Sequence, residues 1–183
     1  VFHPGPGGLE ALRDSAGYAW DVSFFGNVDV ARYPEHARRS EFLRALRARL
    51  EPLGLRLLFR DSAGLDAAEQ VDIIRRSRIN LSTIAACDAG PEPSWGLPER
   101  CYGVPACGGF LLSDRRRHAA DDFADDERAE YDDLDDCVAK VRHFLARFDE
   151  ARGIAERAQA RVARDHGYRH RARRLLDFAR QHG

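Results

Sequence analysis

The segment Asp21-Val-Ser-Phe-Phe-Gly26-Asn27 decides the fold class, because it is a short apolar run that ends at a glycine. Such a run predicts a buried strand that stops in a tight turn. Over residues 34–53 the period changes to that of a helix, with Phe42, Leu43, Leu46 and Leu50 on one face. A strand followed directly by a helix predicts the start of a β-α-β unit.

The same alternation continues along the chain. Further strands are predicted at residues 55–60, 79–84, 108–114 and 128–131, and further helices at 67–76, with Asp66 as N-cap, 99–106 and 116–124. From Leu134 the pattern is helical throughout and predicts three packed terminal helices. Crossovers of this length join parallel strands. The sequence therefore predicts an α/β fold, a Rossmann-like parallel sheet sandwiched by helices and followed by C-terminal helices.

Composition narrows the function classes. The chain has 183 residues, 44% of them hydrophobic, which is enough for one sizeable core. With 29 Lys+Arg against 30 Asp+Glu the net charge is −1, so no overall field would recruit nucleic acid. No apolar stretch is long enough to span a membrane. The four cysteines contain no C-x-x-C pair, and we expect a cytoplasmic protein.

The first residues differ in character from the rest. The chain begins with Val, contains no Met, and is rich in Gly and Pro over residues 1–17. This composition is typical of a linker that leaves an earlier domain. We therefore expect residues 1–17 to be a linker from a missing N-terminal domain and residues 18–183 to form the Rossmann-like domain.

The carboxyl ends of the predicted strands are the expected place for a ligand, as in other open parallel sheets. Gly26-Asn27, Asp61-Ser62 and Ser113-Asp114 follow three of these strands. The longest connection, residues 85–98, is crowded with Gly and Pro around Trp95. Long irregular connections inside a compact domain are often functional, so we place the site there.

Three sets of residues at this edge suit a nucleotide. The backbone at Gly26 and Asn27 can approach an anion, although a plain turn is the alternative because G-x-G-x-x-G is absent. Arg100 falls in the first turn of a predicted helix, where its guanidinium and the helix N–H groups suit a diphosphate; the alternative is a solvated arginine. Trp95 can stack on a base or sugar, or anchor the loop against the sheet.

Other charged clusters are assigned to structure. Residues 121–136 are rich in carboxylates but lack the spacing of a calcium loop, so they predict a solvated face whose last members cap the next helix. Arginines between residues 142 and 180 can pair with these acids, and contact with RNA is a weaker alternative. His166 and His170 are four residues apart, but the intervening Gly167 and the absence of H-E-x-x-H argue against zinc.

The order of five segments resembles the C-terminal, donor-binding domain of GT-B glycosyltransferases of the CgeB, spore-maturation type. The resemblance extends over about residues 21–178, and its segments are Arg78-Ile-Asn-Leu-Ser82, Arg100-Cys-Tyr102, Ala106-Cys-Gly-Gly-Phe-Leu-Leu-Ser-Asp114, Tyr131-Asp-Asp-Leu134 and His166-Gly-Tyr-Arg-His-Arg171.

This resemblance implies an enzyme that transfers a sugar from a nucleotide-diphosphate sugar to an acceptor. Residues 18–183 would bind the nucleotide sugar, and a missing N-terminal domain would bind the acceptor and supply any general base. The chain alone is then not expected to turn over. No cofactor is implied, because GT-B enzymes usually neutralise the leaving diphosphate with helix termini and basic side chains instead of a metal.

The resemblance also implies roles for single residues. Arg100 matches an arginine beside the donor phosphates, and Gly26 matches a glycine in the phosphate-facing first loop. Ser82 stands where the family often has Asn. The glutamate that usually binds the ribose hydroxyls falls at Gly103, and Glu99, one turn earlier, is the candidate substitute. Losing that carboxylate would cost about 1.5–3 kcal/mol of binding, which leaves a degenerate, non-catalytic binding or scaffold module as the alternative.

Overall fold

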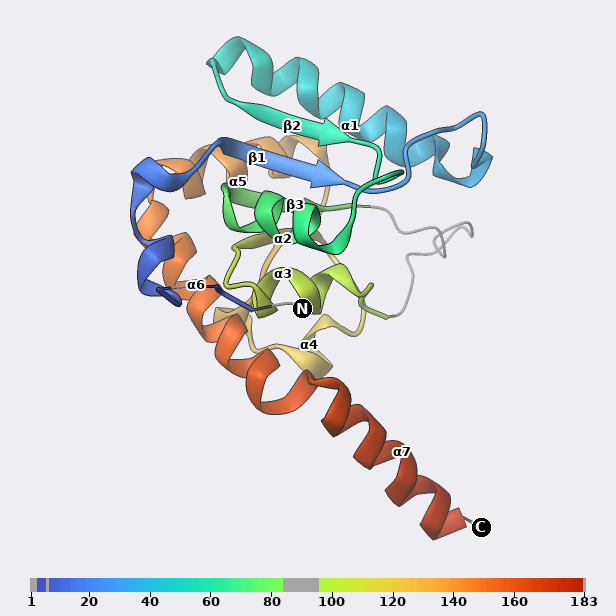
Figure 1. Cartoon of the computed structure of the whole chain (residues 1–183). Coiled ribbons are helices and arrows are strands. Elements are labelled where there is room, and N and C mark those ends of the chain that lie inside the picture. Colours follow the sequence, from blue (N-terminus) through green and yellow to red (C-terminus); the bar gives the residue numbers. More distant parts are fainter. Residues whose placement is uncertain (1–2, 6, 84–95, 183) are drawn as a thin grey trace.

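The fold is built around one parallel sheet of five strands in the order β2-β1-β3-β4-β5 (Figure 1). The computed structural model describes residues 3–5, 7–83 and 96–182. Every pair of neighbouring strands is parallel, as the sequence predicts. The strands are β1 (Trp20–Phe25), β2 (Leu57–Arg60), β3 (Ser77–Ser82), β4 (Leu111–Asp114) and β5 (Ala129–Tyr131).

The helices form where the sequence periodicity predicts them, although their first and last residues differ from the predicted ones. The prediction over residues 116–124 was too long, because only one helical turn forms there. The helices are α1 (Ala37–Leu50), α2 (Ala67–Arg75), α3 (Arg100–Ala106), α4 (Ala119–Asp122), α5 (Leu134–Ala146), α6 (Phe148–Arg161) and α7 (Tyr168–His182). A π-helix, Val162–His166, joins α6 to α7.

Alternating side chains of the strands enter two apolar cores, one on each face of the sheet. On one face Val22 and Phe24 of β1 pack in a cluster with Leu46 of α1 and Val141 of α5. On the other face Phe25 packs in a cluster with residues of α2 and α3. This two-sided burial explains why the strands read as nearly continuous apolar runs.

Local signals fix where the helices begin. Asp66 is the N-cap of α2, as predicted: its side chain accepts a hydrogen bond from the Glu69 N–H at 2.8 Å, and the Glu69 carboxylate accepts one from the Asp66 N–H at 2.9 Å. This reciprocal capping box satisfies two N–H groups that the helix itself cannot pair. It holds the start of α2 close to the carboxyl end of β2.

Part of the N-terminal segment packs on the domain. Leu12 is 6% exposed, and Arg13 forms a salt bridge with Glu156 of α6 at 2.6 Å. Gly108 has a φ of +75°, and a Cβ at this position would lie 2.6 Å from Leu9 Cδ2. Residues 9–13 therefore close over the turn between α3 and β4, whereas the predicted origin of residues 1–17 in an earlier domain stays a prediction.

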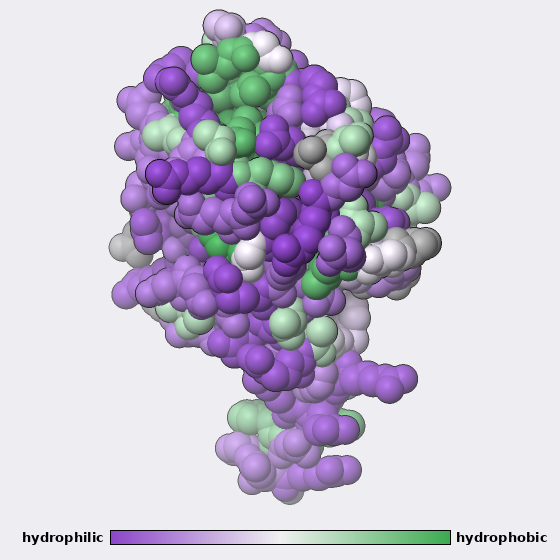
Figure 2. All heavy atoms as spheres, turned by 90° about the vertical axis from the view of Figure 1, so that its left-hand side faces the viewer, coloured by the Kyte–Doolittle hydropathy of each residue, from purple (hydrophilic) through white to green (hydrophobic). Residues whose placement is uncertain are grey.

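The last helix departs from the prediction of three packed terminal helices. α7 projects away from the sheet and its covering helices and contains no buried residue (Figure 1). Leu175, Leu176 and Phe178 are 69%, 57% and 60% exposed. Figure 2 shows apolar side chains on the projecting part of this face, in addition to an apolar patch at its top. Helical periodicity reveals an apolar strip but not whether another element covers it. None of the helices described is both long enough and apolar enough to cross a membrane.

Candidate functional site

The carboxyl ends of the five parallel strands lie at one edge of the sheet, and this edge holds most of the predicted site residues. Gly26 follows β1, Ser82 ends β3 and Arg100 begins α3. Trp95 lies outside the described residues. In a parallel sheet this edge is where a ligand meets loops and helix starts.

Arg100 reaches from α3 to the end of β1. Its Nη2 donates a hydrogen bond to the carbonyl oxygen of Phe25. Its guanidinium carbon lies 4.3 Å from the ring centroid of Phe25 and 5.0 Å from that of Phe24. A Cβ placed on Gly26 would be 3.6 Å from Arg100 Nη2. The structure thus brings Gly26 and Arg100 together.

The charge of Arg100 is not neutralised by a carboxylate of any described residue within ion-pair distance. Burial lowers the pKa of Arg100 to about 10, so the side chain remains a cation at neutral pH. Among the described residues, the half-buried guanidinium is placed against a main-chain carbonyl and two aromatic rings, an arrangement that leaves donors for an anion. The planar donor group of an arginine matches the geometry of phosphate and carboxylate groups.

The turn after β1 is held by the loop after β2. The carbonyl oxygen of Gly26 accepts a hydrogen bond from the Ser62 N–H at 3.2 Å, and Asn27 Oδ1 accepts one from Ser62 Oγ at 3.1 Å. Asp61 accepts from the Val28 N–H at 2.8 Å, and backbone hydrogen bonds from Val28 and Ala63 lower its pKa. The two loops after β1 and β2 therefore form one fixed unit beside Arg100.

Gly26 also meets a steric requirement. A Cβ at this position would lie 2.9 Å from Cζ of Phe24, closer than such atoms approach in proteins. The Phe24 ring is 3% exposed and lies in the core, so it has little room to move. The glycine predicted on sequence grounds is thus required by the packing of the ring that also contacts Arg100.

Ser82 and Glu99 lie outside the unit that the loops after β1 and β2 form. Ser82 is 4% exposed, and its carbonyl oxygen accepts a hydrogen bond from the Tyr131 hydroxyl at 2.9 Å. Glu99 is exposed and precedes α3. With Tyr102 and Gly103 it lines a groove of about 620 Å³ whose described lining includes neither Gly26 nor Arg100.

Two of the sequence segments singled out above meet at this groove. The Arg171 guanidinium lies 4.4 Å from the ring centroid of Tyr102, whose hydroxyl donates to Asp122. A ring nitrogen of His166 lies 3.1 Å from the Asp122 carbonyl oxygen. These contacts connect α3 to the π-helix and the start of α7. No group of three or more possible metal ligands exists among the described residues.

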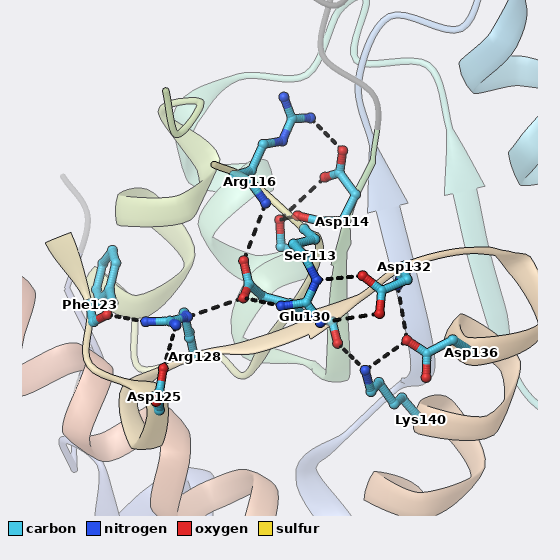
Figure 3. Close-up of polar contacts among 11 residues, drawn as sticks. Ser113, Asp114, Arg116, Phe123, Asp125, Arg128, Glu130, Asp132, Asp136 and Lys140 are labelled. Atoms are coloured by element: carbon cyan, nitrogen blue, oxygen red, sulfur yellow. Dashed lines mark hydrogen bonds and ion pairs between the residues drawn. The ribbon is translucent and has the colours of Figure 1, made fainter. Parts of the chain in front are cut away.

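A second charged region surrounds β5 and extends to the carboxyl end of β4 (Figure 3). Glu130 accepts a hydrogen bond from Arg128 Nε at 3.1 Å and from the Arg116 N–H at 3.3 Å, and its carboxylate lies 3.5 Å from Arg115 Nη1. Further ion pairs surround it: Arg116 with Asp114, Arg115 with Asp132, Arg128 with Asp125, and Lys140 with Asp136.

Some contacts of this region could be predicted from the sequence. Asp133 caps α5 by accepting a hydrogen bond from the Asp136 N–H at 2.9 Å, as predicted. The predicted pairing of the acids with later arginines is confirmed for Arg157 with Asp126 at 3.0 Å and Arg161 with Glu127 at 2.9 Å. The central position of Glu130 was missed. Its only signal was a single acid between two buried residues of a short strand.

The sheet topology and its flanking helices define a Rossmann-like α/β domain of the kind found as the C-terminal half of GT-B glycosyltransferases. The family described as "Glycosyl transferase-like" matches residues 9–177, and the chain belongs to this family. Among solved structures, it is similar to the C-terminal domain of a glycosyl transferase group 1 family protein (LpcC) from Francisella tularensis. The TM-score is 0.51 and the identity 15%, over 89% of this chain and 94% of that chain. No curated protein matches the chain.

Proposed function

We propose that this chain is the donor-binding part of a glycosyltransferase and that it binds a nucleotide-diphosphate sugar at the carboxyl edge of the sheet. Membership of the glycosyl transferase-like family and the fold support the enzyme class. The single observation that carries the site is the cation of Arg100, held beside Gly26 without a carboxylate partner among the described residues. The order of the five sequence segments favours the CgeB type.

Sugar transfer places negative charge on the departing nucleoside diphosphate, so the site must stabilise that charge more as the bond breaks. Arg100 would supply this stabilisation with charged hydrogen-bond donors. The rigid turn at Gly26 and Asn27 would let the diphosphate approach the backbone closely. We propose that no metal ion is required. The acceptor and any general base would come from a preceding domain, so this chain alone binds but does not turn over.

The remaining predicted residues have proposed supporting roles. Asn27 holds the phosphate turn through its contact with Ser62. Glu99 lines the same groove as Gly103, where the family glutamate is absent, which supports Glu99 as the replacement ligand for the ribose hydroxyls. Ser82, buried at the end of β3, would support the floor of the site through its backbone, and Trp95 would stack on the base or sugar.

A non-catalytic binding or scaffold module is the second candidate. Gly103 favours it, because a glycine offers no side chain to the ribose where the family uses a carboxylate. Such a module would keep the family fold and the half-buried Arg100 but would not bind nucleotides with useful affinity. Nucleotide binding therefore separates the two candidates.

The test is a thermal-shift and calorimetric titration with UDP, GDP, TDP and their sugars, with and without magnesium. A ligand at a hundred times its dissociation constant stabilises the fold by about 2.7 kcal/mol. We expect a nucleotide-specific shift that persists without magnesium and is lost in Arg100→Ala. Arg60→Ala is the matched control, because Arg60 ends β2 opposite Phe25 and its side chain is exposed.

Each protein is compared with its own ligand-free melting temperature, which separates binding from stability. A cooperative melt with no shift for any nucleotide would contradict donor binding and favour the scaffold module. An equal loss in Arg60→Ala and Arg100→Ala would also contradict the site, since it would indicate a general electrostatic effect.

A further inference from the structure

A second arginine, carried by a different helix, approaches the turn after β1. Arg39 belongs to the first turn of α1, whereas Arg100 begins α3. Arg39 Nη1 donates a hydrogen bond to the carbonyl oxygen of Asn27 at 2.9 Å. Its guanidinium carbon lies 5.9 Å from the ring centroid of Phe24, the ring that also contacts Arg100 at 5.0 Å. Both arginines thus contact the same ring and the same short turn.

The fold itself fixes the position of Arg39. The next residue, Ser40, donates from Oγ to the carbonyl oxygen of Val28 at 2.8 Å. Consecutive residues of α1 therefore bind consecutive carbonyl groups of the turn. Because Asp61 binds the N–H of Val28, the turn is held from both sides. The guanidinium of Arg39 is in place before any ligand arrives, which lowers the entropic cost of binding.

The two guanidinium groups are close enough to affect each other. After burial, the positive charge of Arg39 is a further cause that lowers the pKa of Arg100. Two like charges near one turn repel, and a bound dianion relieves that repulsion while accepting hydrogen bonds from both groups. A diphosphate carries two phosphoryl groups and so matches a pair of cations better than a monophosphate does.

We propose that Arg39 is a second phosphate-binding residue of the donor site, and that Arg39 and Arg100 together select nucleoside diphosphates over monophosphates. This inference rests on the proposed function, because it assumes that the edge beside Gly26 binds a nucleotide. Arg39 lies outside every segment that carries the family resemblance. The contacts with Phe24 and Asn27 are what assign it to the site.

The test compares the affinity of a nucleoside diphosphate with that of the matching monophosphate by calorimetry, using the base that binds the wild-type protein best. Wild type should prefer the diphosphate. In Arg39→Ala the diphosphate affinity should fall by about tenfold, and the preference over the monophosphate by about fivefold, as expected for losing a charged hydrogen bond. Arg39→Lys should retain part of the preference.

Arg38→Ala is the matched control, because Arg38 is the preceding arginine of α1 and is exposed. It should leave both affinities within twofold of wild type. Distortion of the turn alone would weaken both nucleotides equally, so an unchanged preference in Arg39→Ala would overturn the inference. If Arg39→Ala binds like wild type while Arg100→Ala does not, Arg39 has no role but the donor site stands. If wild type binds no nucleotide, both proposals fail.

Discussion

Two regions beside the sheet use arginine in opposite ways. Around β5 and the end of β4, Arg115, Arg116 and Arg128 each form an ion pair with a carboxylate, and Glu130 connects them (Figure 3). At the end of β1, Arg100 donates to a main-chain carbonyl and packs on aromatic rings. This difference shows that a high local density of arginines does not by itself identify an anion-binding site. An arginine paired with carboxylates contributes to structure, whereas one without a carboxylate partner is available to an anion.

The largest change in stability is expected for a substitution of Glu130, at the centre of the β4–β5 region. Glu130 has a side chain that is 10% exposed and accepts hydrogen bonds from Arg116 and Arg128. Glu130→Ala leaves these donors without their acceptor and should lower the free energy of unfolding by about 2–3 kcal/mol. Urea denaturation measures it. Nucleotide affinity should stay within twofold of wild type, and a selective loss of affinity would move the site to this region.

The next largest effect, a loss of nucleotide affinity, is expected for a substitution in the turn after β1. In Gly26→Ala the new Cβ would meet Cζ of Phe24 at 2.9 Å, so the ring and the adjacent Arg100 must shift. Nucleotide affinity should fall by about tenfold, which is about 1.4 kcal/mol. Gly17→Ala serves as the control, since a Cβ at Gly17 has open space and its φ does not lie in the left-handed region. Unchanged binding in Gly26→Ala would show that the diphosphate does not approach this turn.

A smaller effect with a defined pH dependence is expected at Asp61. Backbone hydrogen bonds from Val28 and Ala63 lower its pKa below the model-peptide value of 3.8. A carboxylate with a lowered pKa in the folded state stabilises the protein above its unfolded pKa and loses this contribution as the pH falls through the folded value. Asp61→Asn should cost about 0.5–1 kcal/mol at pH 7, after allowance for solvent screening.

Urea denaturation at low pH tests whether the pKa of Asp61 is lowered in the folded state. The difference in unfolding free energy between wild type and Asp61→Asn should shrink as the pH falls through the lowered folded-state pKa of Asp61, because the wild-type carboxyl is then protonated. Urea denaturation at pH 7 and at acid pH measures both values. A difference that grows toward acid pH would contradict the assignment of the lowered pKa to these hydrogen bonds.

The smallest effect is expected at the exposed rim of the β4–β5 region. Arg115 and Asp132 form an ion pair whose side chains are 56% and 57% exposed. Asp132→Asn should change the unfolding free energy by less than about 0.5 kcal/mol, because solvent screens exposed pairs. A loss as large as that in Glu130→Ala would show that the region acts as one unit instead of a buried centre with an exposed rim.

Much of the fold could be predicted because its signals are local. The apolar runs of β1 and β3 and the capping residue Asp66 each act within a few positions. The ends of elements were less certain, since strand pairing sets them: β3 begins at Ser77, two residues before the predicted start, where it pairs with Trp20. The exposure of α7 was missed because an apolar strip carries no information about what covers it.

The candidate site was only partly predictable, because it depends on contacts between distant segments. Gly26 and Arg100 were chosen separately, and no spacing rule indicates that they meet. The contacts of Arg39 with Asn27 and Phe24 depend on how α1 packs beside β1. Glu130 was overlooked for the same reason, since two of its arginine partners, Arg115 and Arg116, come from the segment that follows β4. Residue types could be read from the sequence, but pairing of charges required the fold.

The most direct test of the central claim is NMR of the arginine Nε–Hε groups during titration with the best nucleoside diphosphate. Assignment comes from single arginine-to-lysine variants. We predict saturable shifts of the Arg100 and Arg39 resonances, while the resonances of Arg115 and Arg128 do not move. Shifts confined to Arg115 and Arg128, or no shift of Arg100 at a nucleotide concentration that saturates binding, would contradict the assignment of the donor site to the end of β1.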